Sequence, residues 1–538
     1  MFTSILMGIS LAIGQAGSVP AVELGEPQSI QAAPGKGEEP KKGEEPKKGE
    51  EPKKEELPEP REIAPKDIEP IAKALPAPEL EQGEEGLVIS LPVALRLTNA
   101  EAWDIRIAVQ QLQIAVAQRQ GADVLWLPTL IAGVDYQYHS GPYQAVNGTL
   151  LNSSHSNMYA GGAPLAIFAV TDAIFTPLSA RQVVRAQDAN IQTSRNDTLT
   201  DMALSYFELL EAEADLASIM DVDRRAAALV KKAEALTPGL FPSLELARTR
   251  ALKGNIAQVI ETARQRWRTS SAEVARLARL RPTVVLQPLE PPHVRVTLVP
   301  DTLSPEQLIP VALANRPELT FFEAQAEAAR QRARQEKWRP FMPTLIARGG
   351  GTTPPFPMAF GAYGGGTGTD LNNFAQRSDW DLSAVWTLQN LGIGNLALIR
   401  ERSREFDLAR SREYRFRDVV AREVTVAWAD VRSASRRVIL SEQELRQAEL
   451  SARQNLEGLG TVKRPQGGGV GGLNIPIIRP QEVVQALQAL NSAYFNYYGV
   501  VAEYNRAQFR MYRALGNPAQ MIAGHDGLGG PLLECEKK

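Results

Sequence analysis

Two segments of the chain carry apolar residues at helical spacing over an unusual length. Residues 178–237 and 395–457 contain neither glycine nor proline. Because an α-helix rises about 1.5 Å per residue, each would extend about 90 Å. The apolar positions recur every three or four residues, with Glu213 as an interruption: Leu199, Met202, Tyr206, Leu209, Leu216 and Met220 in the first segment, and Val420, Val424, Ala427 and Val431 in the second. Such a stripe requires a partner helix that covers it.

Part of that partner is predicted after each long helix. The long segments end in turns rich in glycine and proline, at residues 237–242 and 458–480. A shorter helix is expected to return from each turn, at residues 244–280 and 481–515.

The other part is predicted before the strands of each half. Ser90 with Pro92, and Ser304 with Pro305, are typical of helix starts, and Gln307 stands where a capping box places its glutamine. Each start opens a helix of about 35 residues. One such helix and one returning helix together match the length of a long helix, so we expect them to line it end to end.

Two strands are predicted in each half of the chain. Residues 127–132 read LPTLIA and residues 342–347 read MPTLIA, and a strand is expected to start at each string. Loops rich in glycine, asparagine and serine are expected at 140–162 and 349–377, each followed by a second strand. In the second half that strand, at 379–390 (DWDLSAVWTLQN), alternates apolar and polar residues. The alternation is weakly typical of transmembrane strands; a half-exposed sheet in a water-soluble protein is the alternative.

The order of elements is the same in both halves, which indicates a duplicated unit. We predict a mainly helical α+β fold in which this unit runs helix, strand, strand, long helix, helix, with four strands per chain. Four strands cannot close a barrel, because about eight is the practical minimum, and open strand edges are not tolerated in lipid. Membrane insertion would therefore need several copies of the chain. A dimer and a trimer both remain open on physical grounds.

The net charge and the lack of catalytic or metal-binding motifs exclude several classes of function. The 538 residues include 59 basic and 62 acidic side chains, for a net charge of −3, so no basic excess favours a nucleic-acid partner. No run of about 18 apolar residues follows the N-terminus, and no transmembrane helix is predicted. The histidines are scattered (His139, His155, His293 and His525), Cys535 is remote from them, and Walker-A and G-x-S-x-G strings are absent. No catalytic, metal-binding or cofactor-binding residue is predicted, and no enzyme.

The N-terminal part of the chain has a composition of its own. Residues 5–13 are apolar and are followed by small residues, which is typical of a signal peptide, here assigned to residues 1–21, although a basic n-region is missing. In the following Pro/Glu/Lys-rich stretch the hexapeptide GEEPKK occurs three times in residues 37–54. Such a segment buries too little apolar surface to fold. It is interpreted as a solvated linker, or alternatively as a tether.

From about residue 87 to 520 the chain resembles the TolC-like outer-membrane efflux proteins. The strings that carry the resemblance are ANRPEL at 314–319, WTLQNLGIG at 386–394, EYNRAQ at 503–508 and ALGNP at 514–518. Each string is loose, but their order, spacing and duplication together are specific.

The resemblance implies a fold, an assembly and a function. Three chains would pool their strands into one transmembrane β-barrel in the outer-membrane lipid, and their helices into an oligomeric α-helical barrel, the periplasmic tunnel. The tip of the tunnel would dock a periplasmic adaptor (membrane fusion) protein and an inner-membrane pump of a tripartite system, and the channel would passively export small molecules. Because EVVQA at 482–486 is similar to the family's acidic-aliphatic motif after the second turn, Glu482 and Arg479 are the candidate periplasmic gate. The glycine-rich stretch 466–472 departs from the family pattern at this tip.

A different class of protein is kept as the alternative, namely a periplasmic or envelope coiled-coil spacer that never enters a membrane. The predicted boundaries are as follows: signal peptide 1–21, disordered linker 22–86, first repeat 87–283, inter-repeat equatorial segment 284–303, second repeat 304–520 and C-terminal tail 521–538.

Overall fold

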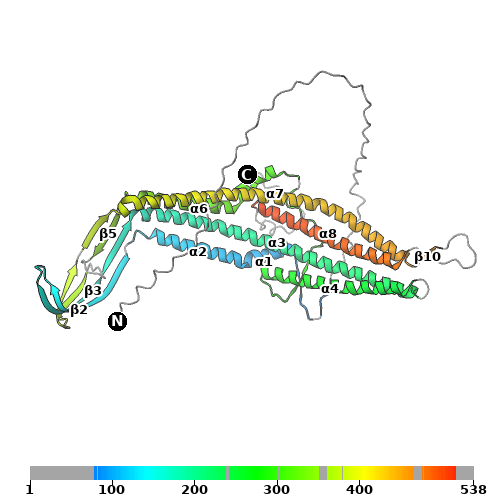
Figure 1. Ribbon diagram of the computed structural model, residues 1–538, viewed down its shortest axis with the longest axis horizontal. Helices are drawn as coiled ribbons and strands as arrows, with labels where there is room; N and C mark the ends of the chain where they lie inside the picture. The colour runs from blue at the N-terminus through cyan, green and yellow to red at the C-terminus, as the bar shows by residue number, and fades with distance from the viewer. Residues whose placement is uncertain are drawn as a thin grey trace, which may run out of the picture. The chain divides into compact units, whose positions relative to one another are not determined.

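The computed structural model describes residues 78–81, 83–127, 129–237, 241–300, 302–349, 360–378, 380–463, 475–476 and 478–516 (Figure 1). All of them belong to one compact unit of the chain, Glu69–Lys538. The predicted signal peptide, the GEEPKK repeats, the glycine-rich stretch 466–472 and the C-terminal tail lie outside the described residues.

The two long helices are confirmed. Helix α3 spans Val170–Leu236 and helix α7 spans Ile393–Gly458, with 67 and 66 residues. Helix α3 begins eight residues before the predicted start at residue 178. It continues through Pro177, whose missing N–H removes a single helical hydrogen bond. None of the described helices combines the length and the apolar character needed to cross a bilayer.

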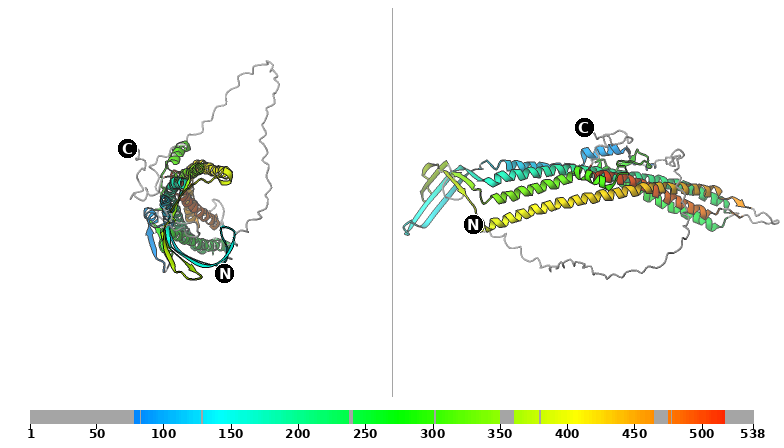
Figure 2. Two further views of the ribbon diagram at one scale, coloured as in Figure 1. Left: turned by 90° about the vertical axis from the view of Figure 1, so that its left-hand side faces the viewer. Right: turned by 90° about the horizontal axis from the view of Figure 1, so that it is seen from above.

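The shorter helices line the long ones as expected. Helices α1 (Leu91–Glu101), α2 (Trp103–Asp123) and α4 (Ser243–Leu277) pack on α3. Helices α5 (Pro305–Asn315), α6 (Pro317–Trp338) and α8 (Pro480–Ala514) pack on α7 in the same way. Helix α3 also contacts α6 and α8, which joins the two halves into one layer of helices (Figure 2).

The prediction of one 35-residue helix before the strands was wrong in both halves. Helices α5 and α6 are separated by Arg316, whose extended backbone (ψ 116°) follows from the clash that Pro317 makes with a helical residue before it. Helices α1 and α2 break at Ala102 (ψ 133°) with no proline present. The predicted capping box is confirmed, since the Ser304 backbone N–H donates to Gln307 Oε1 (3.2 Å).

A single sheet continues from one end of the long helices (Figure 2). Strands β2 (Thr129–Gln144) and β3 (Leu150–Ala169) form a hairpin. On its other side β3 pairs with β5 (Thr344–Gly349) and β6 (Phe360–Thr367), which in turn pair with β8 (Trp380–Val385) and β7 (Asn373–Ser378). The six strands therefore occupy four rows.

The loops predicted between the strands are much shorter than expected. Most of residues 140–162 belong to β2 and β3, and only Ala145–Thr149 forms the turn. The range 349–377 likewise contains β6 and most of β7. Glycine and asparagine are depleted in strands, and here they belong to strands that pair with neighbours far away in the sequence. The last strand ends at Val385, five residues before its predicted end, and a short left-handed stretch at Asn390, Leu391 and Gly392 leads into α7.

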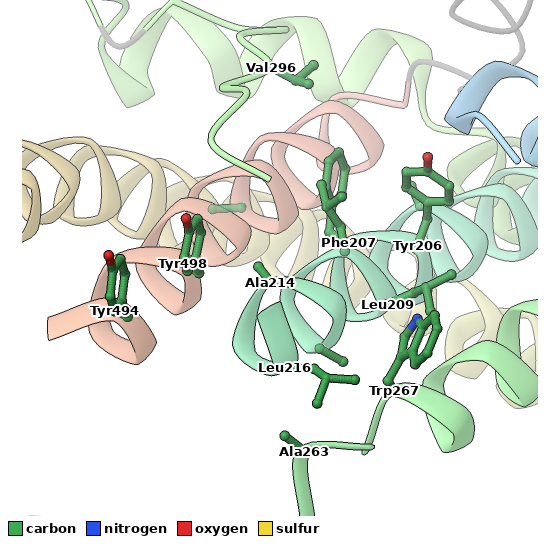
Figure 3. Close-up of a cluster of buried hydrophobic side chains, with 14 of the residues drawn as sticks. Tyr206, Phe207, Leu209, Ala214, Leu216, Ala263, Trp267, Val296, Tyr494 and Tyr498 are labelled. Carbon is green, nitrogen blue, oxygen red and sulfur yellow. The ribbon is translucent and has the colours of Figure 1, made fainter. Parts of the chain in front are cut away.

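The core follows the predicted apolar stripe of α3 (Figure 3). Leu209 and Leu216 of α3 lie beside Trp267 of α4, and all three side chains are fully buried. Tyr494 and Tyr498, one helical turn apart on α8, stack with parallel rings (centroids 6.3 Å apart). On α7 the predicted stripe at 420–431 is buried as well. Burial of each large apolar side chain contributes about 1.5–3 kcal/mol to folding.

Candidate functional site

The predicted gate residues lie at the start of α8, at the opposite end of the helices from the sheet (Figure 1). Arg479 is the N-cap residue of α8, and its carbonyl accepts the backbone N–H of Glu482 (3.0 Å). Both side chains are exposed. Within the described residues no ion pair joins the two side chains, so they are neighbours along one helical turn and not a closed pair.

Next to Arg479 and Glu482, hydrogen bonds join α4 to α8 and α3 to α7. Arg248 of α4 donates to Gln481 of α8 (Nη1 to Oε1, 2.9 Å), and Lys232 of α3 donates to the carbonyl of Leu456 near the end of α7 (2.7 Å). A groove of about 420 Å³ runs between α4 and α8, lined by Arg248, Ala251, Leu252, Asn255, Gln481, Val484, Gln485 and Gln488. Four of the eight lining residues carry side-chain amides, three are apolar and one is an arginine, so the groove offers a partner both hydrogen-bonding groups and apolar surface.

The string EYNRAQ places two amides that hold the inter-repeat segment. Asn505 and Gln508 are fully buried. The backbone N–H of Val296 donates to Asn505 Oδ1 (2.8 Å), while Asn505 Nδ2 donates to the carbonyl of Val294 (2.9 Å). Gln508 Oε1 accepts the N–H of Val299 (2.9 Å). These side chains replace the strand partner that this backbone lacks.

The strings ANRPEL and ALGNP meet in a cluster of ion pairs. Arg316 is almost completely buried and pairs with Glu318 (2.8 Å) and with Glu423 of α7. Arg513, near the C-terminal end of α8, contacts both glutamates (3.4 Å each). Gly516 closes the cluster at φ +81°, where an added Cβ would lie 2.7 Å from the carbonyl carbon of the residue before Arg316. The cluster therefore joins the beginning and the end of the second half of the chain.

A second group of charges lies between α3, α4 and α8, with its two carboxylates largely buried. Arg266 of α4 pairs with Glu211 (2.6 Å) and Asp215 (2.7 Å) of α3, and Arg506 of α8 pairs with the other oxygen of Glu211 (2.8 Å). Burial raises the pKa of Asp215 to about 7, and Glu211 adds to the increase while Arg266 opposes it. Burial alone raises the pKa of Glu213 to about 7.

Sequence reasoning named Arg479 and Glu482 and missed the groove and both ion-pair clusters. The signal for the groove is the recurrence of glutamine on one face of α8, at Gln481, Gln485 and Gln488. The clusters left no such signal, because their members lie far apart in the chain. Among the described residues no group of three or more His, Cys, Asp and Glu side chains could hold a metal ion.

The fold was compared with known proteins by sequence and by structure. No family model and no curated protein matches the sequence. Solved structures do match. The outer-membrane channel OprN has a TM-score of 0.63 at 17% identity and covers 79% of this chain and 90% of its own. The CmeC outer membrane channel of Campylobacter jejuni has a TM-score of 0.62 at 13% identity, over 80% of this chain and 88% of its own. The outer membrane protein VceC of Vibrio cholerae has a TM-score of 0.61 at 14% identity, over 79% and 96%.

At these identities the similarity shows the fold. The chain has the mainly helical, duplicated fold of TolC-like outer-membrane channels, and the fold class expected from the sequence is confirmed.

Proposed function

We propose that this protein is an outer-membrane channel of a tripartite efflux system, assembled from three copies of the chain and acting as a passive conduit for small molecules. The observation that carries the proposal is the fold, which the chain shares over about four fifths of its length with proteins described as outer-membrane channels. The channel itself performs no chemistry.

The sheet supports assembly with further copies. Within the described residues, β2 on one side and β7 with β8 on the other have no neighbouring strand. Unpaired strand edges bind other strands readily, and in lipid they must be paired. Pairing β2 of one copy with β7 and β8 of the next is a head-to-tail contact, which gives a closed ring when the rotation between successive copies adds up to a full turn. The number three comes from the resemblance.

Exposed apolar side chains support a lipid-facing surface on the sheet. Val134, Tyr136 and Tyr138 alternate along β2 and are each about half exposed, and Leu382 of β8 is 78% exposed. The intervening position Gln137 is polar. Apolar residues directed outward, with aromatic residues among them, are what a transmembrane strand presents to lipid.

The opposite end of the helices is proposed to dock the periplasmic adaptor protein, which would link the channel to an inner-membrane pump. The groove between α4 and α8 provides hydrogen-bonding groups for that contact. Arg479 and Glu482, exposed at the start of α8, are proposed to gate the passage.

The first experiment measures the mass and shape of the full-length protein extracted from membranes in mild detergent, by light scattering and negative-stain imaging. The expected protein mass is close to three times the 58.8 kDa of one chain, less the mass of the predicted signal peptide where it is removed. The particle should exceed roughly 100 Å in length, given a 67-residue helix at about 1.5 Å per residue. A monomer or a dimeric rod recovered in the soluble fraction would contradict the channel and favour the envelope spacer.

The gate is tested by conductance in planar lipid bilayers. Arg479→Ala and Glu482→Ala are each expected to raise single-channel conductance, because the passage loses a charged side chain. The matched control is Glu401→Ala, which removes an exposed carboxylate of α7 at the sheet end and should leave conductance unchanged. Conductance equal to wild type in both tip variants would rule out a gate at these positions.

A further inference from the structure

Two of the four histidines meet across the β2–β3 hairpin. His139 and His155 are register partners on the two strands. Their ring centroids lie 5.3 Å apart, and the ring planes are inclined by 39°. The positions that flank the pair on the same face are Gln137 and Asn157 on one side, and Gly141 and Ser153 on the other. The pair therefore lies on a face without apolar neighbours, where an ion from water can reach it.

Each ring uses one nitrogen in a hydrogen bond within the hairpin. His139 Nε2 lies 3.3 Å from the carbonyl oxygen of Gly141. A carbonyl only accepts, so the neutral ring carries its proton on Nε2 and keeps a lone pair on Nδ1. His155 Nδ1 lies 3.0 Å from Ser153 Oγ. If this nitrogen donates to the hydroxyl, Nε2 of His155 is free. Metal-binding histidines typically donate their other ring N–H to a partner of this kind.

The spacing of the rings suits one shared ion. A zinc ion lies about 2.1 Å from a coordinating imidazole nitrogen, and so about 3.2 Å from the ring centre. At the tetrahedral angle of about 109°, two rings bound to one ion have centres about 5.2 Å apart. The observed centroid distance of 5.3 Å agrees with this value.

We propose that His139 and His155 form a two-imidazole site for a divalent transition-metal ion, with Zn²⁺ and Cu²⁺ as the best-suited ions and water in the remaining positions. Imidazole nitrogen suits both ions, and Cu²⁺ binds such sites more tightly than Zn²⁺ does. Ser153 acts as the positioning residue of His155. The site lies within one hairpin, so the proposal holds or fails independently of the channel function.

The test is a calorimetric titration with Zn²⁺ at pH 7.5 on full-length protein purified in mild detergent without a polyhistidine tag. Wild type is expected to bind one ion at this site, and His139→Asn and His155→Asn are each expected to lose it. Ser153→Ala, which removes only the hydrogen-bond partner, should weaken binding by about tenfold. His293→Asn is the matched control and should bind as wild type does.

A second measurement separates metal binding from a purely structural ring contact. His139→Phe keeps an aromatic ring beside His155 but cannot coordinate an ion. With Cu²⁺ as the probe, electron paramagnetic resonance should show coupling to two imidazole nitrogens in wild type and to one in His139→Phe. The proposal is overturned if wild type binds neither ion saturably, or if the His139 and His155 variants bind with wild-type affinity and stoichiometry.

Discussion

Glu213 offers the sharpest test of how charge is buried in the helices. It interrupts the apolar stripe of α3, and burial raises the pKa of its carboxyl group from the ordinary 4.5 to about 7. The folded protein therefore favours the neutral form. The stability that this preference contributes is complete below pH 4.5 and is lost as the pH rises through about 7. The corresponding cost of ionising Glu213 in the folded protein at pH 8 is at most about 3 kcal/mol.

The variant Glu213→Gln cannot ionise, so it should be more stable than wild type at pH 8 by up to about 3 kcal/mol, and by less than about 1 kcal/mol at pH 5. The assay is urea-induced unfolding of the detergent-solubilised protein, followed by circular dichroism at 222 nm at both pH values. Glu208→Gln is the control, because Glu208 is exposed on the same helix and its charge stays in water. An equal difference between Glu213→Gln and wild type at both pH values would refute the reasoning.

Three further substitutions test the packing by the same urea assay. Arg316→Met removes a side chain that is 1% exposed and leaves two partly buried glutamates short of a partner, so the free energy of unfolding should fall by about 2–3 kcal/mol; Arg404→Met, at an ion pair on the surface of α7, is the control and should change it little. Gly516→Ala introduces a side chain at φ +81° with its Cβ 2.7 Å from the Asn315 carbonyl carbon, and should cost about 2 kcal/mol; an unchanged unfolding midpoint would contradict this close approach. Trp267→Ala empties the centre of the α3–α4 contact, and a loss of about 3–5 kcal/mol is expected; a loss below about 1 kcal/mol would place this side chain outside the core.

The candidate site was accessible to sequence reasoning only in part. Arg479 and Glu482 could be named because the string at 482–486 resembles the family's acidic-aliphatic motif after the second turn, and their role as a gate remains a prediction. The predicted boundaries of the two repeats likewise remain predictions. Asn505 and Gln508 belong to a string that carried the resemblance, but nothing in that string indicates that they bind backbone more than 200 residues away.

The sequence by itself determined the two long helices and the helices that return from them. Their hydrogen bonds run between residues four apart, so the absence of glycine and proline, the apolar spacing and the capping box at Ser304 are sufficient signals. Even the break between α5 and α6 has a local cause in Pro317. The matching break at Ala102 has none.

Only the tertiary structure decided the strands and the contacts between distant residues. A strand pairs with backbone far away in the chain. For this reason the glycine- and serine-rich segments that were predicted as loops are parts of β2, β3, β6 and β7. The same pairing brings His139 opposite His155, although nothing in the sequence pattern indicates that the two are neighbours. For the same reason Arg316 and Arg513 both pair with Glu423. The sequence shows which residues a segment contains, but the packing of the segments decides which partner a buried charge has.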